Sequence, residues 1–124
     1  MHRSRLTQIL IDCSESTYDK GIAFWSGALG LEVVEDDERY TALKARDGQV
    51  RVALQRVPDE SAYHLDIETD DVEAEVARLE KLGAVRKYKK HTWWVMRAPT
   101  GHDFCVIRQQ SKDFPDDQAS TWDD

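Results

Sequence analysis

The order of hydrophobic and polar positions changes along the chain between a period of two, typical of strands, and a period near 3.6, typical of helices. The segment RLTQILIDC at 5–13 alternates as a strand does. In the segment at 21–30, Ile22, Trp25 and Leu29 recur at helical spacing. Three further strand-like segments follow, at 31–36, 39–45 and 49–57. The first half therefore predicts the order β-α-β-β-β.

The second half repeats this order. AYHLDIET at 62–69 is strand-like, and the segment DDVEAEVARLEKLG at 70–83 carries an apolar stripe at helical spacing. Asp70 is the expected N-cap of that helix, with Glu73 three residues later as in a capping box. Three strand-like segments come next, at 84–90, 92–97 and 102–109. We therefore predict an internal duplication, with one module at about 6–57 and a second at about 62–109.

Aligning the two modules assigns equivalent positions on their first strands. In this register Gln8 matches His64, and Asp12 matches Glu68. Because side chains alternate along a strand, His64 and Asp66 share one face. The apolar residues between them are expected to pack against the helix, so the polar set faces away from it. By the same argument Gln8 and Asp12 lie on the helix-free face of the first module.

Length and charge narrow the classes of function. A chain of 124 residues with 40% hydrophobic content is long enough for one compact domain, which we expect over residues 1–110. The formal net charge of −7 argues against nucleic acid and anionic membranes as partners, because both require a cationic surface. No apolar run is long enough to span a bilayer, and the first ten residues do not read as a secretory signal. We expect a cytoplasmic protein.

Neither the two cysteines nor the C-terminal tail predicts a catalytic or metal-binding site. Cys13 and Cys105 lie in strand-like segments without the spacing of a redox motif or a zinc ribbon, so we expect buried free thiols. The tail at 111–124 contains five aspartates and one lysine. Such a segment buries little apolar surface, so we expect it to be mobile or packed on a partner subunit.

Three segments, taken in their order and spacing, resemble a known family: AFWSGALGLEVVED, YHLDIETDDVEAEVARLEKLGA and WWVMRAPTGHDFCVI. Over roughly residues 6–109 the chain resembles the glyoxalase-like domains of the vicinal oxygen chelate superfamily, relatives of glyoxalase, bleomycin-resistance proteins and dioxygenases. An Asp-Pro-x-Gly-Asn turn is usual there before the last strand. This chain has APTGH, so Ala98 and His102 depart from the pattern.

The resemblance implies an α+β fold in which two tandem βαβββ modules form a curled mixed sheet around a central cup, with helices on the outer faces. Metal-using relatives place four ligands in the cup, from the first and last strand of each module. By position these sites fall on Gln8, His64 and Cys105, with the fourth within Val52–Leu54. The usual last-strand glutamates are missing, so we expect no cofactor and no intact four-ligand metal site. A divalent metal held by Gln8, His64 and Cys105 is the alternative.

His64 is the candidate catalytic residue, because an imidazole that titrates near neutrality beside carboxylates can accept a proton. Gln8, Asp12 and Asp66 are candidate ligand-binding residues. The two aspartates have an alternative role, which is to bond backbone groups or cations such as Arg51 or Arg97.

The pair Trp93-Trp94 must place one ring on each side of its strand, whichever parity holds. One of the two therefore faces the cup, and both are candidate ligand-binding residues for a flat or apolar molecule. Trp25, on its helix, is interpreted as core packing.

The leading hypothesis is a small-molecule-binding protein that holds an organic ligand in the cup between the modules and assembles as a homodimer. Whether it is an enzyme stays open, and a metal-dependent lyase or isomerase of the vicinal oxygen chelate type is the first alternative. A non-catalytic protein-interaction module is the second, suggested by the acidic tail and Trp122.

Overall fold

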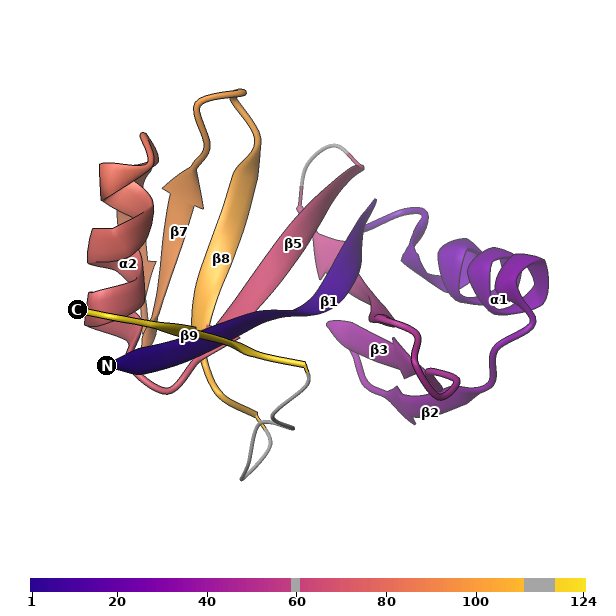
Figure 1. Ribbon diagram of the computed structural model, residues 1–124. Coiled ribbons are helices and arrows are strands. Elements are labelled where there is room, and N and C mark those ends of the chain that lie inside the picture. Colours follow the sequence, from indigo (N-terminus) through magenta and orange to yellow (C-terminus); the bar gives the residue numbers. More distant parts are fainter. Residues whose placement is uncertain (59–60, 111–117) are drawn as a thin grey trace. The chain divides into compact units, whose positions relative to one another are not determined.

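The computed structural model describes residues 1–58, 61–110 and 118–124, and these residues form two helices and nine strands (Figure 1). In chain order the elements are β1 (His2–Ser14), α1 (Tyr18–Leu29), β2 (Val33–Asp36), β3 (Tyr40–Leu43), β4 (Arg51–Val57), β5 (Ala62–Thr69), α2 (Val72–Lys81), β6 (Val85–Lys90), β7 (Trp93–Arg97), β8 (Asp103–Arg108) and β9 (Ser120–Trp122). None of the described helices is long and apolar enough to cross a bilayer.

The chain divides into two compact units. The first unit comprises Gln8–His64, and the second comprises Met1–Thr7 together with Leu65–Asp124. Strand β1 therefore begins in the second unit and ends in the first. Each unit contains one helix and its own set of mixed strands.

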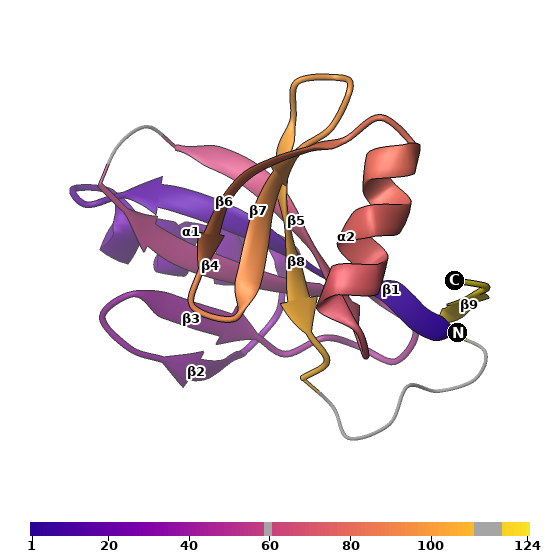
Figure 2. The ribbon, with the colours of Figure 1, turned by 90° about the vertical axis from the view of Figure 1, so that its left-hand side faces the viewer.

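The two units share one strand connectivity. In the first, the hydrogen-bonded order is β2-β3-β4-β1, with β1 and β4 parallel and the other pairs antiparallel. In the second, the order is β6-β7-β8-β5, with β5 and β8 parallel and the other pairs antiparallel (Figure 2). The first strand of each module is thus joined to the last by parallel pairing. This confirms the predicted α+β class and the two modules of mixed strands, but not the predicted curling of the sheet around a central cup.

Each helix covers one face of its own strands, as the alternation predicts. In the first unit Ile11 and Cys13 of β1 form a buried cluster with Leu54 of β4, and Ile22 and Trp25 of α1 pack against it. Asp12, which lies between Ile11 and Cys13 on β1, points to the opposite face. Ile11 therefore faces the helix, as predicted.

The second unit is built in the same way around α2. Val76 and Leu79 of α2 cluster with Met96 and Val106, and Ile67 of β5 packs against them. Leu65, which the alternation also assigns to this side of β5, is 44% exposed and is not part of the cluster.

The start of α2 lies one residue later than predicted. The N-cap is Asp71, whose side chain accepts a hydrogen bond from the backbone N–H of Ala74 at 3.1 Å. Asp70, the predicted N-cap, instead accepts one from the backbone N–H of Arg3 at 2.8 Å. Aspartate is a favourable N-cap residue at either position. Asp71 caps the helix here, while Asp70 is bonded to Arg3 of β1.

The end of the acidic tail has a partner in its own chain. Strand β9 pairs antiparallel with His2–Ser4 of β1. This pairing was not predicted from the sequence, and it corrects the expectation of a mobile or partner-bound segment for Ser120–Trp122. The tail residues at 111–117 lie outside the described residues.

Two glycines of α1 make a matched test of how closely this helix approaches its strands. A Cβ built on Gly21 would lie 3.0 Å from Cys13 Sγ and 3.4 Å from Leu54 Cδ2, whereas one on Gly27 would meet nothing within 4 Å. An alanine within a helix is ordinarily more stable than glycine by about 0.5–1 kcal/mol. Gly27→Ala should therefore stabilise the protein by about that amount, and Gly21→Ala should not. Urea unfolding of both variants measures this, and equal stabilisation would show that the contact is not tight.

Candidate functional site

A histidine and an aspartate from distant parts of the sequence form a hydrogen-bonded pair in the first unit. His64 Nδ1 lies 2.7 Å from Asp12 Oδ2, and the side chains of the two residues are 16% and 14% exposed. His64 stands at the start of β5, and Asp12 lies on the helix-free face of β1. The structure thus brings together two of the residues that the sequence singled out.

The second carboxylate oxygen of Asp12 is available to another group. Asp12 Oδ1 is buried, and no described residue forms a hydrogen bond with it. A buried carboxylate oxygen without a donor is unfavourable, because its hydration is lost without replacement. The arrangement is therefore suited to a donor that arrives with a ligand.

Gln8 lies on the same face of β1 and is held by a tyrosine. Tyr40 Oη donates to Gln8 Oε1 at 3.0 Å. Tyr40 is the β3 partner of Gln55, which in turn is the β4 partner of Asp12. The helix-free face of the first unit is therefore polar, and its amide and hydroxyl groups can bond a ligand as well as one another.

An aromatic cavity of about 440 Å³ adjoins Asp12 in the first unit. Its walls include Phe24 and Trp25 of α1 and Tyr63 of β5. Phe24 and Tyr63 are 63% and 66% exposed. The rings of Phe24 and Trp25 pack edge to face, with their centroids 5.1 Å apart. Trp25 therefore packs against the core, as interpreted, and lines a cavity as well.

The cavity also contains one cationic side chain. Lys20 of α1 lines it, and its ammonium group forms no hydrogen bond or ion pair with any residue that the structure describes. Lys20, Phe24 and Tyr63 were not among the predicted site residues, because an exposed lysine or aromatic side chain gives no signal in the sequence until its neighbours in the fold are known.

The remaining candidates belong to the second unit. Asp66 is 6% exposed, and its partner in the parallel pairing of β5 with β8 is Cys105, a half-buried free thiol. A carboxylate and a thiol therefore stand side by side. Of the two cysteines expected to be buried, Cys13 is buried and Cys105 is only partly so.

The structure decides the orientation of the two adjacent tryptophans. Trp94 packs with the cluster beneath α2, and its Nε1 donates to Glu73 at 3.3 Å while Arg86 lies 4.9 Å from the ring centroid. Because side chains alternate, Trp93 is on the helix-free side of β7. The sequence left this choice open, and of the two candidates Trp93 is the one positioned to meet a ligand on that face.

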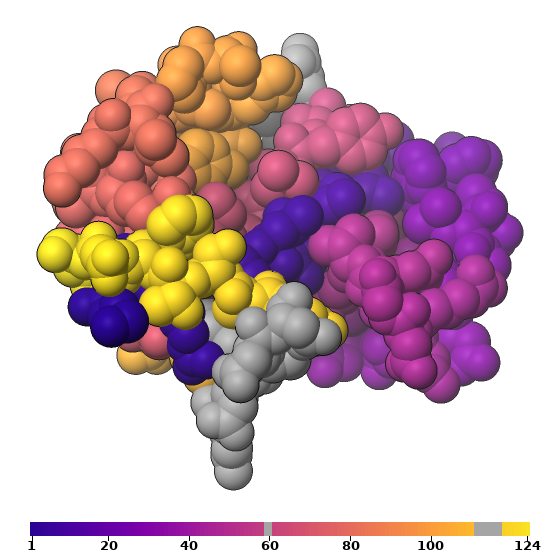
Figure 3. Space-filling model, viewed as in Figure 1, coloured from indigo at the N-terminus to yellow at the C-terminus, as the bar shows by residue number. Residues whose placement is uncertain are grey.

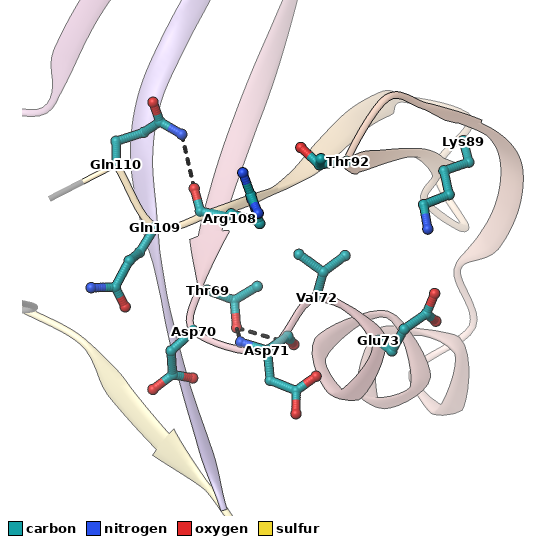
Figure 4. A pocket seen from close by; sticks show the side chains of 10 residues that line it. All are labelled: Thr69, Asp70, Asp71, Val72, Glu73, Lys89, Thr92, Arg108, Gln109 and Gln110. Carbon is teal, nitrogen blue, oxygen red and sulfur yellow. Dashed lines mark hydrogen bonds between the residues drawn. The ribbon is translucent and has the colours of Figure 1, made fainter. Parts of the chain in front are cut away.

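A second hollow, of about 700 Å³, lies where α2 begins (Figure 4). It is lined by Thr69, Asp70, Asp71, Val72, Glu73, Lys89, Thr92, Arg108, Gln109 and Gln110. Its acidic groups already have donors: Arg3 for Asp70, Ala74 for Asp71, and Arg86 for Glu73. Sequence reasoning singled out this helix start only as a capping sequence.

The chain resembles known proteins in sequence and in fold. A family model described as a glyoxalase-like domain matches residues 8–107. No curated protein matches the sequence.

Three solved structures illustrate the similarity in fold. A hypothetical protein BH1468 from Bacillus halodurans is 13% identical with a TM-score of 0.65, and the match covers 90% of this chain and 99% of that one. The Mn(II)-bound glyoxalase from Novosphingobium aromaticivorans is 26% identical with a TM-score of 0.58, over 85% of this chain and 40% of that one. A variant of homoprotocatechuate 2,3-dioxygenase from Brevibacterium fuscum is 15% identical with a TM-score of 0.59, over 86% of this chain and 32% of that one. This chain therefore spans less than half of the glyoxalase and dioxygenase chains.

Proposed function

Because the chain belongs to the glyoxalase-like domain family, we propose that it binds a small organic ligand in the first unit through the Asp12–His64 pair on the helix-free face, with the aromatic cavity on the α1 side of the strands as a second pocket. The observation that carries this proposal is Asp12 Oδ1, which is buried without a donor among the described residues. A ligand N–H or O–H would satisfy it. The cavity volume of about 440 Å³ falls within the range of small-molecule sites.

The lining of the cavity defines the class of ligand. Phe24, Trp25 and Tyr63 offer ring surfaces to a flat, partly apolar molecule. Lys20 offers a positive charge without a competing partner among the described residues, which suits a carboxylate or another anionic substituent. An aromatic carboxylate matches the rings and Lys20 of the cavity, whereas a ligand of the Asp12–His64 pair must bring a hydrogen-bond donor for Asp12 Oδ1.

The Asp12–His64 pair can do more than bind. A carboxylate that bonds one ring nitrogen fixes the orientation of the imidazole and stabilises its protonated form, so the other nitrogen can give or take a proton. The pair therefore supplies the acid-base group that a lyase or isomerase requires, whereas a sequestering protein would use only its hydrogen bond.

A metal-dependent lyase or isomerase is the second candidate function. The ligands that the sequence offers are Gln8, His64 and Cys105, and in the second unit Cys105 is the β8 partner of Asp66. An imidazole, a carboxylate and a thiolate suit zinc better than the harder Mn(II) ion named for the Novosphingobium relative. Gln8, which the sequence placed in the ligand set, accepts a hydrogen bond from Tyr40. A divalent ion here would act as a Lewis acid on a substrate oxygen.

His64→Ala should weaken binding of a hydroxylated aromatic acid such as 6-hydroxy-2-naphthoate by about 1–2 kcal/mol, because Asp12 loses its partner and the ligand loses one hydrogen bond. Isothermal titration of wild type and variant measures this. His102→Ala, at an exposed histidine of the second unit, is the matched control and should bind as wild type does. Equal affinity of His64→Ala and wild type would contradict the proposal.

Metal analysis on the same samples separates the two functions. We propose that protein purified without chelator contains no tightly held divalent ion. One equivalent of zinc per chain, lost in His64→Ala, would instead establish the metal-dependent candidate. Homodimer assembly and a cytoplasmic location remain predictions from the sequence.

A further inference from the structure

The C-terminal residues 118–124 form a strap over the second unit. Strand β9 pairs with His2–Ser4 of β1, and Trp122 Nε1 donates to Ser4 Oγ at 2.9 Å. The guanidinium of Arg78, on α2, lies 3.8 Å from the centroid of the Trp122 ring. In Figure 3 the yellow C-terminal atoms lie directly against the indigo atoms of the N-terminus and against helix α2.

A buried histidine ties this strap to the helix. His2 Nε2 lies 2.8 Å from Glu75 Oε1 of α2, and His2 Nδ1 forms a short hydrogen bond with Asp124 Oδ1. The side chain of His2 is 1% exposed and that of Glu75 is fully buried. Both ring nitrogens of His2 therefore face carboxylate oxygens.

This geometry requires a charged imidazole. A neutral imidazole has one N–H and one lone pair, so it can donate to only one of the two carboxylates. Glu75 also accepts two hydrogen bonds from Arg78, at 2.8 and 2.9 Å, which keeps it ionised. Only the imidazolium form of His2 can bond both Glu75 and Asp124.

We propose that residues 118–124 are a pH-dependent strap, fastened while His2 is an imidazolium and loosened when His2 loses its proton. The charged groups that face the site are Glu75 and Arg78 from α2, Asp124 from the strap, and the α-ammonium of Met1, which lies 2.8 Å from Asp124 Oδ2. When His2 is neutral, Glu75 keeps Arg78 as its partner. Asp124 loses its hydrogen bond from the ring, so the strap is the element that loosens.

The direction of the pH dependence follows from the pKa of His2. Burial disfavours the charged ring, but the hydrogen bonds to Glu75 and Asp124 outweigh burial and raise the pKa above its ordinary value. The contribution of His2 to stability is therefore complete below its unfolded-state pKa of about 6.5 and is lost as pH rises through the higher folded-state pKa. The strap should therefore be closed at about pH 6 and should open as pH rises through the folded-state pKa of His2.

Hydrogen exchange measured by NMR tests the strap. After correction for the intrinsic pH dependence of exchange, protection of the β9 amides in wild type should fall at least about tenfold between pH 6 and pH 9, and the Trp122 indole N–H signal should shift with it. His2→Gln should show low protection at both pH values. His102→Gln replaces an exposed histidine of the same unit and should behave as wild type does.

Asp124→Asn keeps the proposal testable if His2→Gln does not fold. The Asp124 side chain is 37% exposed, so the variant should fold, and loss of one carboxylate should move the opening transition to lower pH. Constant protection in wild type, an unmoved transition in Asp124→Asn, or a transition that persists in folded His2→Gln would overturn the proposal. The last result would assign the pH dependence to the α-ammonium of Met1 instead.

Discussion

Replacing Glu75 with alanine should lower the free energy of unfolding by about 3–5 kcal/mol, because it leaves the charges of two neighbours without their partner. The Glu75 carboxylate is fully buried and accepts hydrogen bonds from His2 and from Arg78. Hydrogen bonds from Arg78 and His2 overcome the effect of burial, so the pKa of Glu75 lies below its ordinary value. The group is therefore ionised at neutral pH, and urea unfolding at pH 7 measures the full loss.

A glutamate on the same helix provides the control. Glu80 is 40% exposed and bonds Arg86 at 3.1 Å, so Glu80→Ala should change the free energy of unfolding by about 1 kcal/mol or less. If the Glu75 and Glu80 variants lost the same stability, the buried cluster would contribute no more than a surface ion pair.

The second large effect is expected in the first unit. Leu54 has no exposed surface and packs with Ile11, Tyr18 and the residues of α1 that cover them. Leu54→Ala removes three carbon atoms from this cluster and leaves a cavity, so it should cost about 2–5 kcal/mol of unfolding free energy. Urea unfolding checks the value.

Leu29, at the end of α1, is the matched control. Its side chain is 38% exposed, so Leu29→Ala removes less buried area and should cost clearly less than Leu54→Ala. A loss in Leu54→Ala as small as that in Leu29→Ala would mean that this core collapses around the missing atoms.

The order of the elements and the faces of their strands follow from local patterns in the sequence. Alternation at Ile11 and Asp12 predicted which side chain meets the helix, and the structure confirms the choice for Ile11. The duplication was visible for the same reason, because periods of two and 3.6 are local properties that each module repeats. The family could also be predicted from the sequence, because each of the three segments that resemble it is a continuous stretch of the chain.

Which distant groups meet depends on long-range packing and cannot be inferred from these local patterns. His64 bonds Asp12 across 52 residues of sequence, Trp94 rather than Trp93 turns toward α2, and His2 is placed between Glu75 and Asp124. Each of these pairings depends on the register between strands and on the packing of a helix over them, and a one-residue change in register would exchange the faces. Local periodicity specifies the direction of a side chain relative to its own strand, whereas its partner is specified by long-range packing.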